Sequence, residues 1–392
     1  MFINPLQPPG LVNNVPIIQP TEKKSEEIPR FVNYLADYTG CGHWRMIWPE
    51  HALNAYKKCI VQSTTVMVTD PKYYHNVNAI RVQRQATQQQ LQFLKYIKAN
   101  IGCRIIYEID DLCFREDLPM YNAFRKHFDS DLIRRTSQEC MELADEMTVT
   151  CDYLKQYYKN KTNQKNITVI PNYMPRWWIG NIYDSKHISK LFDKHKKQPR
   201  IIYPGSTAHF DVRPNNRTPD DLTHVLEAIV QSRKKYKWVF LGAAPLALKP
   251  LIKSGEIEFH KWSDLYDYPY SIMKLEPSAM IAPLADNVFN RCKSNLKYIE
   301  ACALGLPIVC QDLCTYESAK FKFATGKEML NQLDNIFDTK KNYSKYSQQA
   351  RAHAELLWLE NESNLTKYEE LYKYPYMSPK RHHLNKINDK NN

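Results

Sequence analysis

Short apolar runs alternate with longer amphipathic stretches over most of the chain. The apolar runs are rich in Val and Ile, which is typical of strands buried in a parallel sheet. The amphipathic stretches show helical spacing. In Ala86–Gly102, for example, Leu91, Leu94 and Ile97 recur on one helical face, and Gly102 is placed to end the helix. Strands that alternate with helices indicate βαβ units, so the pattern predicts an α/β fold with parallel sheets.

The predicted strands form two groups. The first group comprises Arg30–Asp37, Thr64–Asp70, Cys103–Asp111, Met147–Thr150 and Asn166–Asn172. The second group begins at "RIIYPG" and continues through "KWVFLG", "IEFH", "AMIAPL" and "LPIVCQ". A helix over Pro219–Tyr236 is predicted within this group, with acids at its start and bases at its end, as the helix dipole favours. Two such groups predict two doubly wound, Rossmann-like domains that face a cleft.

Composition shifts between these groups predict the domain boundaries. The expected segments are an irregular, Pro-rich arm (1–28), a first Rossmann-like domain (29–174), a charged linker (175–199), a second Rossmann-like domain (200–345), C-terminal helices (346–376) and a disordered basic tail (377–392).

The net charge indicates which kinds of partner the protein binds, and the cysteines indicate its cellular compartment. A net charge of +12 favours anionic partners such as nucleotide phosphates, nucleic acid or an anionic membrane surface, although a Lys-rich surface also serves solubility alone. The ten cysteines include no C-x-x-C pair, which excludes zinc-ribbon and thioredoxin-like motifs and fits a reducing cytosol. No secretory leader and no transmembrane segment is recognisable in the sequence, so a cytoplasmic location is expected.

One acidic residue stands out in the segment "KSNLKYIEACALGLPIV". On a helical wheel Leu296, Ile299 and Ala303 form the apolar stripe, and Glu300 lies only ~40° from Leu296, at the border of that stripe. Lys293 and Lys297 share the flank of Glu300. Cations beside free N–H groups at a helix start suit a phosphate, and Glu300 further along suits ribose hydroxyls. A plain Lys–Glu pair on a helix surface explains the same spacing.

The longer segment "APLADNVFNRCKSNLKYIEACALGLPIVCQD" resembles the donor site of GT-B glycosyltransferases, particularly the glycogen-synthase-like retaining group. In that group a helix bearing a Glu is followed by small residues and G-x-P-[IV]-V. The segments "YEIDD" and "APLxDNxFNxxKSNLKxxE" are similar to a phage-type glycosyltransferase group, which extends the expected location to a phage-infected cell. "RIIYPGS", "WVFLG" and "VIPN" fit the same order of elements.

The resemblance implies roles for individual residues. Glu300 would hold the nucleotide ribose, and Lys293 would neutralise the donor diphosphate. Further donor-binding positions are Ser294, Asn295, Lys297, Asn290, Gly205 and Ser206. Gly40 and Gly42 resemble the glycine loop of the acceptor domain.

The chain departs from the family pattern at one position. Many retaining relatives carry two glutamates spaced E-x7-E, and Cys292 stands at the first of these positions. A thiol cannot supply the carboxylate, so the contact to the donor sugar is missing or comes from Asp286 or Asn290.

Other side chains are candidates for chemistry. Asp110 and Asp111 end a predicted parallel strand, where one of them would serve as the catalytic base for an acceptor hydroxyl, or both would cap a turn. His209 and Arg45 are candidate ligands of phosphate or acceptor. No metal-binding motif is recognisable, so no metal and no cofactor beyond the nucleotide-sugar co-substrate is expected.

The expected function is transfer of a sugar from a nucleotide-diphosphate sugar to an acceptor hydroxyl. The acceptor partner is a glycan or a hydroxylated base in DNA. A non-catalytic protein that binds a nucleotide sugar or nucleic acid on a decayed GT-B scaffold is the alternative, and Cys292 keeps it open.

Overall fold

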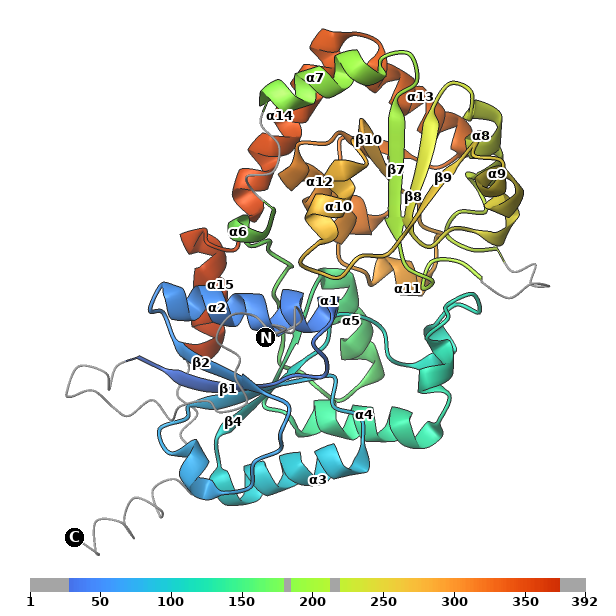
Figure 1. The fold of residues 1–392 in the computed structure, drawn as a ribbon. Coiled ribbons are helices and arrows are strands. Elements are labelled where there is room, and N and C mark those ends of the chain that lie inside the picture. Colours follow the sequence, from blue (N-terminus) through green and yellow to red (C-terminus); the bar gives the residue numbers. More distant parts are fainter. Residues whose placement is uncertain (1–27, 180–184, 212–218, 374–392) are drawn as a thin grey trace, which may run out of the picture. The chain divides into compact units, whose positions relative to one another are not determined.

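The computed structural model describes residues 28–179, 185–211 and 219–373. The predicted arm, apart from its last residue, and the predicted basic tail lie outside these ranges. The chain divides into two compact units. Unit 1 comprises 1–111, 130–172 and 359–392, and unit 2 comprises 112–129 and 173–358 (Figure 1).

Unit 1 contains a six-stranded, wholly parallel sheet with the strand order β2-β1-β3-β4-β5-β6. Its strands are β1 (Arg30–Tyr34), β2 (Ile60–Thr64), β3 (Ala79–Gln83), β4 (Arg104–Glu108), β5 (Glu146–Val149) and β6 (Ile167–Val169). Its α-helices are α1 (Gly40–Gly42), α2 (Trp48–Ala55), α3 (Gln88–Tyr96), α4 (Asp131–Leu143), α5 (Asp152–Lys161) and α15 (Glu362–Lys373). Every residue of β3 and β4 is buried, as expected for central strands covered by helices on both faces.

In unit 1 one predicted strand is misplaced and another strand was missed. The second strand is β2 (Ile60–Thr64), not Thr64–Asp70, and β3 (Ala79–Gln83) was not predicted. Val66 is 65% exposed, and its backbone N–H donates to the Thr64 hydroxyl at 3.0 Å, so the chain turns after Thr64. The β-branched residues of Thr64–Asp70 suggested a strand, but apolar side chains also occur in loops, where they do not alternate between two faces.

Unit 2 contains a second six-stranded parallel sheet with the order β12-β11-β10-β7-β8-β9. Its strands are β7 (Arg200–Gly205), β8 (Lys237–Gly242), β9 (Glu258–Lys261), β10 (Ala279–Ala282), β11 (Ile308–Gln311) and β12 (Phe321–Phe323). Its α-helices are α6 (Arg176–Ile179), α7 (Ser185–His195), α8 (Leu226–Ser232), α9 (Lys249–Lys253), α10 (Tyr268–Lys274), α11 (Val288–Arg291), α12 (Leu296–Leu304), α13 (Gly326–Phe337) and α14 (Lys340–Leu357). Two parallel, helix-flanked sheets confirm the predicted pair of Rossmann-like domains.

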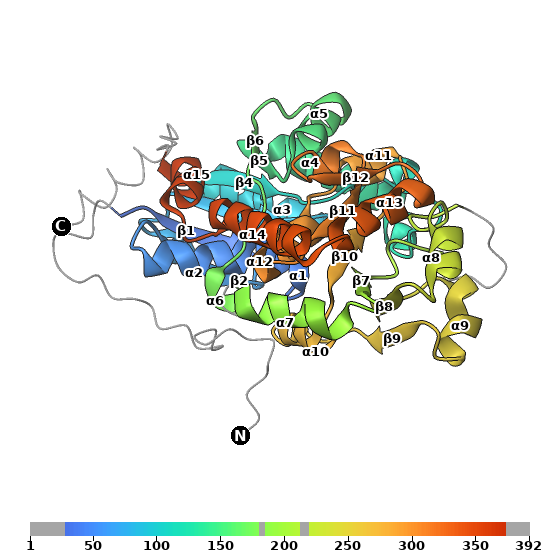
Figure 2. The same ribbon diagram turned by 90° about the horizontal axis from the view of Figure 1, so that it is seen from above.

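Several boundaries differ from the sequence expectation. The segment 175–199 belongs to unit 2 and contains α6 and α7, and α7 lies beside α14 in both views, where Lys340 and Asp193 form an ion pair of 2.5 Å (Figures 1 and 2). The last described helix, α15, belongs to unit 1 although α14 belongs to unit 2.

The predicted helix over 219–236 is shorter than expected. The side chain of Asp220 accepts hydrogen bonds from the backbone N–H groups of Leu222 and Thr223, both at 3.0 Å, and this turn delays α8 until Leu226. Asp221 therefore lies in a turn at the sheet edge, not in a first helical turn.

Candidate functional site

The site residues of unit 2 gather where its parallel strands end. Gly205 is the last residue of β7, and the loop that follows carries Ser206 and His209. The first two turns of α12 carry Lys297 and Glu300. Helices of βα units begin at the carboxyl edge of the sheet, which is the edge that binds ligands in doubly wound folds. The helix wheel therefore placed Glu300 correctly near the apolar face, and the structure buries it to 7% exposure.

Glu300 is a buried carboxylate with little compensation. The Tyr268 hydroxyl donates to its Oε2 at 2.8 Å and is its one hydrogen-bond donor among the residues that the structure describes. Burial raises the pKa of Glu300 to about 7, although the bond from Tyr268 and the charge of Lys297 oppose the shift. Carboxylate oxygens have about four lone-pair sites, so Glu300 has capacity for further donors such as vicinal hydroxyls.

Tyr268 is held in place by two tryptophans. Its ring stacks with Trp178, with 6.1 Å between centroids, and with Trp262, with 5.2 Å. The indole N–H of Trp178 donates to the Leu265 carbonyl at 3.0 Å. This aromatic stack fixes the direction of the hydroxyl that reaches Glu300.

Lys297 belongs to a chain of polar contacts that runs into the protein. Its Nζ lies 3.2 Å from Nε2 of His209, and Nδ1 of His209 lies 2.7 Å from Oδ2 of Asp221. Partial burial and the neighbouring Lys293 charge lower the pKa of Lys297 to about 8. Burial, and next the charge of Lys297, lower the pKa of His209 to about 4, so this imidazole is neutral near pH 7.

Asp221 forms the fully buried end of this chain. Its Oδ1 accepts from the Tyr121 hydroxyl at 2.5 Å, the Asn290 side-chain amide at 2.5 Å and the Ala285 N–H at 3.0 Å. Burial alone would raise the pKa of Asp221, but the bonds from His209, Tyr121 and Ala285 outweigh it and hold the pKa below its usual value.

The other predicted donor-binding residues lie around this network. Helix α12 begins at Leu296, so Lys293, Ser294 and Asn295 precede it instead of forming its first turn. The Lys293 ammonium lies over the Phe289 ring, 3.9 Å from its centroid. Ser206 is exposed, and Gly205 is buried where an added Cβ would lie 2.5 Å from the Tyr203 ring.

Both predicted substitutes for the missing carboxylate have partners within unit 2. Cys292 is fully buried. Asn290 is also fully buried. Its amide nitrogen donates to Asp221, Tyr121 and the Ala285 carbonyl, whereas its side-chain oxygen has no hydrogen-bond partner among the described residues. Asp286 forms a bidentate ion pair with Arg291 at 2.6 and 2.7 Å. Asn290 therefore supports the site as a scaffold residue.

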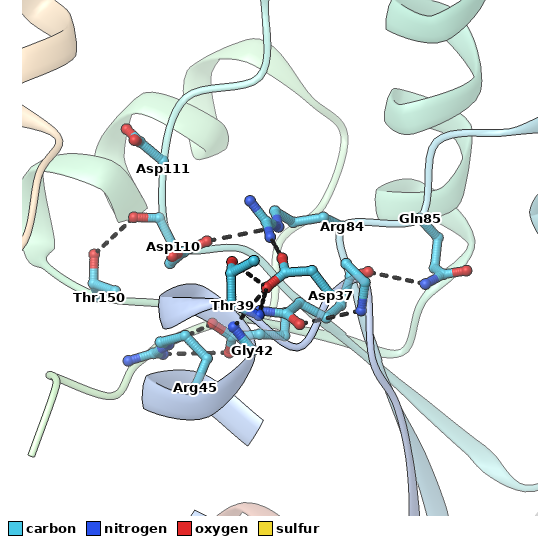
Figure 3. A network of polar contacts seen from close by, with 12 residues as sticks. Asp37, Thr39, Gly42, Arg45, Arg84, Gln85, Asp110, Asp111 and Thr150 are labelled. Carbon is cyan, nitrogen blue, oxygen red and sulfur yellow. Dashed lines mark hydrogen bonds and ion pairs between the residues drawn. The ribbon is translucent and has the colours of Figure 1, made fainter. Parts of the chain in front are cut away.

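The carboxyl edge of the unit 1 sheet carries a second polar cluster, centred on Asp37 (Figure 3). Oδ1 of Asp37 accepts from the Thr39 N–H at 2.8 Å and the Gly42 N–H at 3.3 Å, and Oδ2 pairs with Arg84. A Cβ at Gly42 would lie 1.9 Å from the Asp37 carbonyl oxygen, so the loop requires glycine there, whereas Gly40 has nothing within 4 Å. The predicted glycine loop thus has one constrained and one unconstrained glycine.

Asp110 and Asp111 lie at the same edge, in the loop after β4 rather than on the strand. Figure 3 shows the Asp110 carboxylate directed toward Arg84 and the Asp111 carboxylate directed away from it. Oδ1 of Asp110 is 3.9 Å from Nε of Arg84. Arg84 itself has φ of +47°, a conformation that is strained for a residue with a Cβ.

Arg45 lies in the core of unit 1. Its guanidinium is fully buried and bonds to Oε1 of Glu108 at 2.6 Å, the Ile170 carbonyl at 2.7 Å and the Asn172 side chain at 2.9 Å. A buried guanidinium with these partners stabilises the core, so Arg45 is not placed to serve as the predicted ligand of phosphate or acceptor.

Three residues of the unit 2 network, Tyr121, Asp221 and Tyr268, were not predicted from the sequence. Asp221 was predicted to be an acid at a helix start. Tyr121 lies in a loop and Tyr268 begins α10, and a lone tyrosine gives no functional signal in one sequence. These side chains belong to segments far apart in the chain, which only the fold brings together.

Within the described residues, no group of three or more His, Cys, Asp or Glu side chains is placed to hold a metal ion. The same part of the chain has no helix that is both long and apolar enough to cross a membrane.

No protein-family model and no curated protein matches the sequence. Solved structures do match. HepE of Anabaena in complex with UDP-glucose matches with a TM-score of 0.57 at 12% identity, covering 88% of this chain and 99% of that protein. An α-glucosyltransferase in complex with UDP and DNA containing an HMU base matches with a TM-score of 0.53 at 11% identity, covering 88% and 98%. A TarM variant of S. aureus in complex with UDP matches with a TM-score of 0.50 at 12% identity, covering 78% and 58%.

The similarity spans both units of the chain. At 11–12% sequence identity, it supports a conclusion about the fold only. These structural neighbours are glycosyltransferases, and together with the two parallel sheets they show that the chain has the GT-B glycosyltransferase fold.

Proposed function

We propose that the protein transfers a sugar from a nucleoside diphosphate sugar to an acceptor hydroxyl. The observation that carries the proposal is Glu300, a buried carboxylate with spare acceptor capacity beside Lys297 at the ligand-binding edge of unit 2. A carboxylate that has lost water without gaining donors is costly, and such sites recur where ligands bind. UDP in complexes of HepE and TarM supports the same chemistry.

The proposed mechanism depends on charge and position. The hydroxyls of the donor ribose would donate to Glu300, which fixes the nucleotide along α12. Lys297 and Lys293 would then lie toward the diphosphate, where cations stabilise the negative charge that develops on the leaving group. Asp110 or Asp111 of unit 1 is the proposed base for the acceptor hydroxyl. No step requires a metal ion in this proposal.

Titration with UDP tests the donor site directly. Glu300→Gln should weaken UDP binding about tenfold or more, because an amide loses the charge-assisted bonds to ribose. Lys293→Ala should weaken it through lost charge neutralisation. Glu317→Gln and Lys327→Ala, which change exposed residues of the same unit, are the matched controls. Folded Glu300 and Lys293 variants that bind UDP and turn over donor like the parent would contradict the proposal.

The proposed acceptor is a hydroxyl of a glycan or of a modified DNA base. The net charge of +12 and the DNA complex of one structural neighbour support the second class. Binding of duplex DNA should then fall steeply with salt. Negligible DNA binding at low salt would leave the glycan as the acceptor.

A non-catalytic role as a nucleotide-sugar or nucleic-acid binding protein is the second candidate. Cys292 favours it, because a buried thiol stands where retaining relatives carry a carboxylate. Release of nucleoside diphosphate from a panel of nucleotide sugars, even by slow hydrolysis, would rule it out.

A further inference from the structure

The side chains of Asp221, His209 and Lys297 form a continuous chain in unit 2. Asp221 is fully buried and His209 is 8% exposed, so the chain leads from the interior to the ligand-binding edge of the sheet. Two links tie the Asp221 turn to the loop after β7. The Asp221 N–H donates to the His209 carbonyl at 3.1 Å, and the His209 imidazole reaches the Asp221 carboxylate at 2.7 Å.

The chemistry of the three groups determines where each proton lies. An ionised carboxylate only accepts hydrogen bonds, so Nδ1 of His209 carries the proton that points at Asp221. Nε2 of the neutral ring then has its lone pair toward Lys297, 3.2 Å away, and accepts from the ammonium. The reverse tautomer would set two donors against each other at Lys297 and two acceptors against each other at Asp221.

The interior end of the chain cannot rotate. Oδ1 of Asp221 accepts from Tyr121 and Asn290 at 2.5 Å each, and Tyr121 comes from the separate segment 112–129. Nδ2 of Asn287 also donates to the Tyr121 hydroxyl, at 3.1 Å. The Asp221 carboxylate is therefore fixed in orientation. It orients the His209 imidazole, which in turn orients the Lys297 ammonium.

We propose that Asp221, acting through His209, is a positioning residue that holds the Lys297 ammonium where the donor diphosphate binds. The inference rests on the proposed nucleotide-sugar function and adds to it an identified support for the phosphate-binding cation. A flexible lysine gains from such support, because a fixed ammonium loses less freedom on binding than a free one. Asn290 supports this arrangement, because its side-chain amide donates a hydrogen bond to Asp221.

Three substitutions separate positioning from simple folding. Asp221→Asn removes the charge that selects the His209 tautomer, and His209→Leu breaks the chain. His209→Gln keeps it, because one amide can donate to Asp221 and accept from Lys297. The probes are UDP and uridine, since only UDP carries phosphates. All measurements use the full-length chain.

We expect Asp221→Asn and His209→Leu to weaken UDP binding about tenfold, His209→Gln to restore it, and uridine binding to stay unchanged. In the background of Lys297→Ala, Asp221→Asn should have no further effect on UDP. Nitrogen-15 NMR of the parent, which needs no substitution in the network, should show Nδ1 of His209 protonated and Nε2 unprotonated at neutral pH.

Two results would overturn the inference alone. The first is that the parent binds UDP and Asp221→Asn either leaves its affinity for UDP unchanged or weakens its affinities for UDP and uridine equally. The other is the opposite His209 tautomer. A parent that binds no nucleoside diphosphate at all would overturn the proposed function, and this inference with it.

Discussion

Glu108 in unit 1 and Glu300 in unit 2 are both buried glutamates, yet their surroundings are opposite. Glu108 has two guanidinium partners, Arg45 and Arg81, and also accepts from the Thr148 hydroxyl. Burial would raise the pKa of Glu108, but the two arginines outweigh it and hold the pKa below its usual value. For Glu300, with Tyr268 as its donor, burial prevails and the pKa rises to about 7.

We interpret this difference as that between a structural carboxylate, Glu108, and the proposed donor-binding carboxylate, Glu300. Glu108 has its partners inside the folded protein, so its cluster is complete without a ligand. Glu300 is desolvated without equivalent compensation, so folding alone leaves it in an unfavourable state that a hydroxyl-bearing ligand would relieve. Burial by itself is therefore no guide to function, whereas the balance between burial and partners is.

The largest expected effect is on the stability of unit 1. Glu108→Gln leaves Arg45 and Arg81 buried without a counter-charge, so it should lower the free energy of unfolding by about 3–5 kcal/mol. Urea titration of the parent and the variant measures this loss. Glu317→Gln, an exposed acid, is the control and should leave the urea midpoint unchanged. A Glu108 variant as stable as its parent would remove the structural half of the comparison.

The sequence predicted the architecture far better than these roles. Alternating strands and helices, with Gly102 at a left-handed helix end with φ of 69°, follow from local patterns and were recovered. Arg45 was misread because its partners, Glu108 and Asn172, are distant in sequence and are brought to it by the parallel sheet. The Glu300 position followed from the helix wheel, but its ribose role came from resemblance and is still a prediction.

Glu300→Gln should raise the free energy of unfolding above pH 7, whereas Glu108→Gln should lower it. Since folding raises the pKa of Glu300 from 4.5 to about 7, the folded state binds the proton more tightly, and the stability of the parent falls as pH rises through this window. Glu300→Gln lacks this loss, so it should match the parent near pH 4.5 and exceed it by up to about 3 kcal/mol above pH 7.

Thermal or urea unfolding across this pH range measures the difference between the two proteins. Glu50, whose pKa burial also raises to about 7, titrates in both and cancels. If the stabilities of parent and variant changed in parallel with pH, the Glu300 carboxylate would not be destabilised by its burial. The proposed contrast between Glu300 and Glu108 would then be wrong.

The smallest effect separates the two hydroxyl donors. Tyr268→Phe removes the bond to Glu300, and Thr148→Val removes one bond to Glu108. Each should cost about 1–2 kcal/mol near pH 8, where both glutamates are ionised. Near pH 5 Glu300 is protonated and Glu108 is still ionised, so the cost of Tyr268→Phe should shrink while that of Thr148→Val persists. Urea titrations of both variants at the two pH values provide the test, and equal behaviour of the pair would show that the two carboxylates share one protonation state.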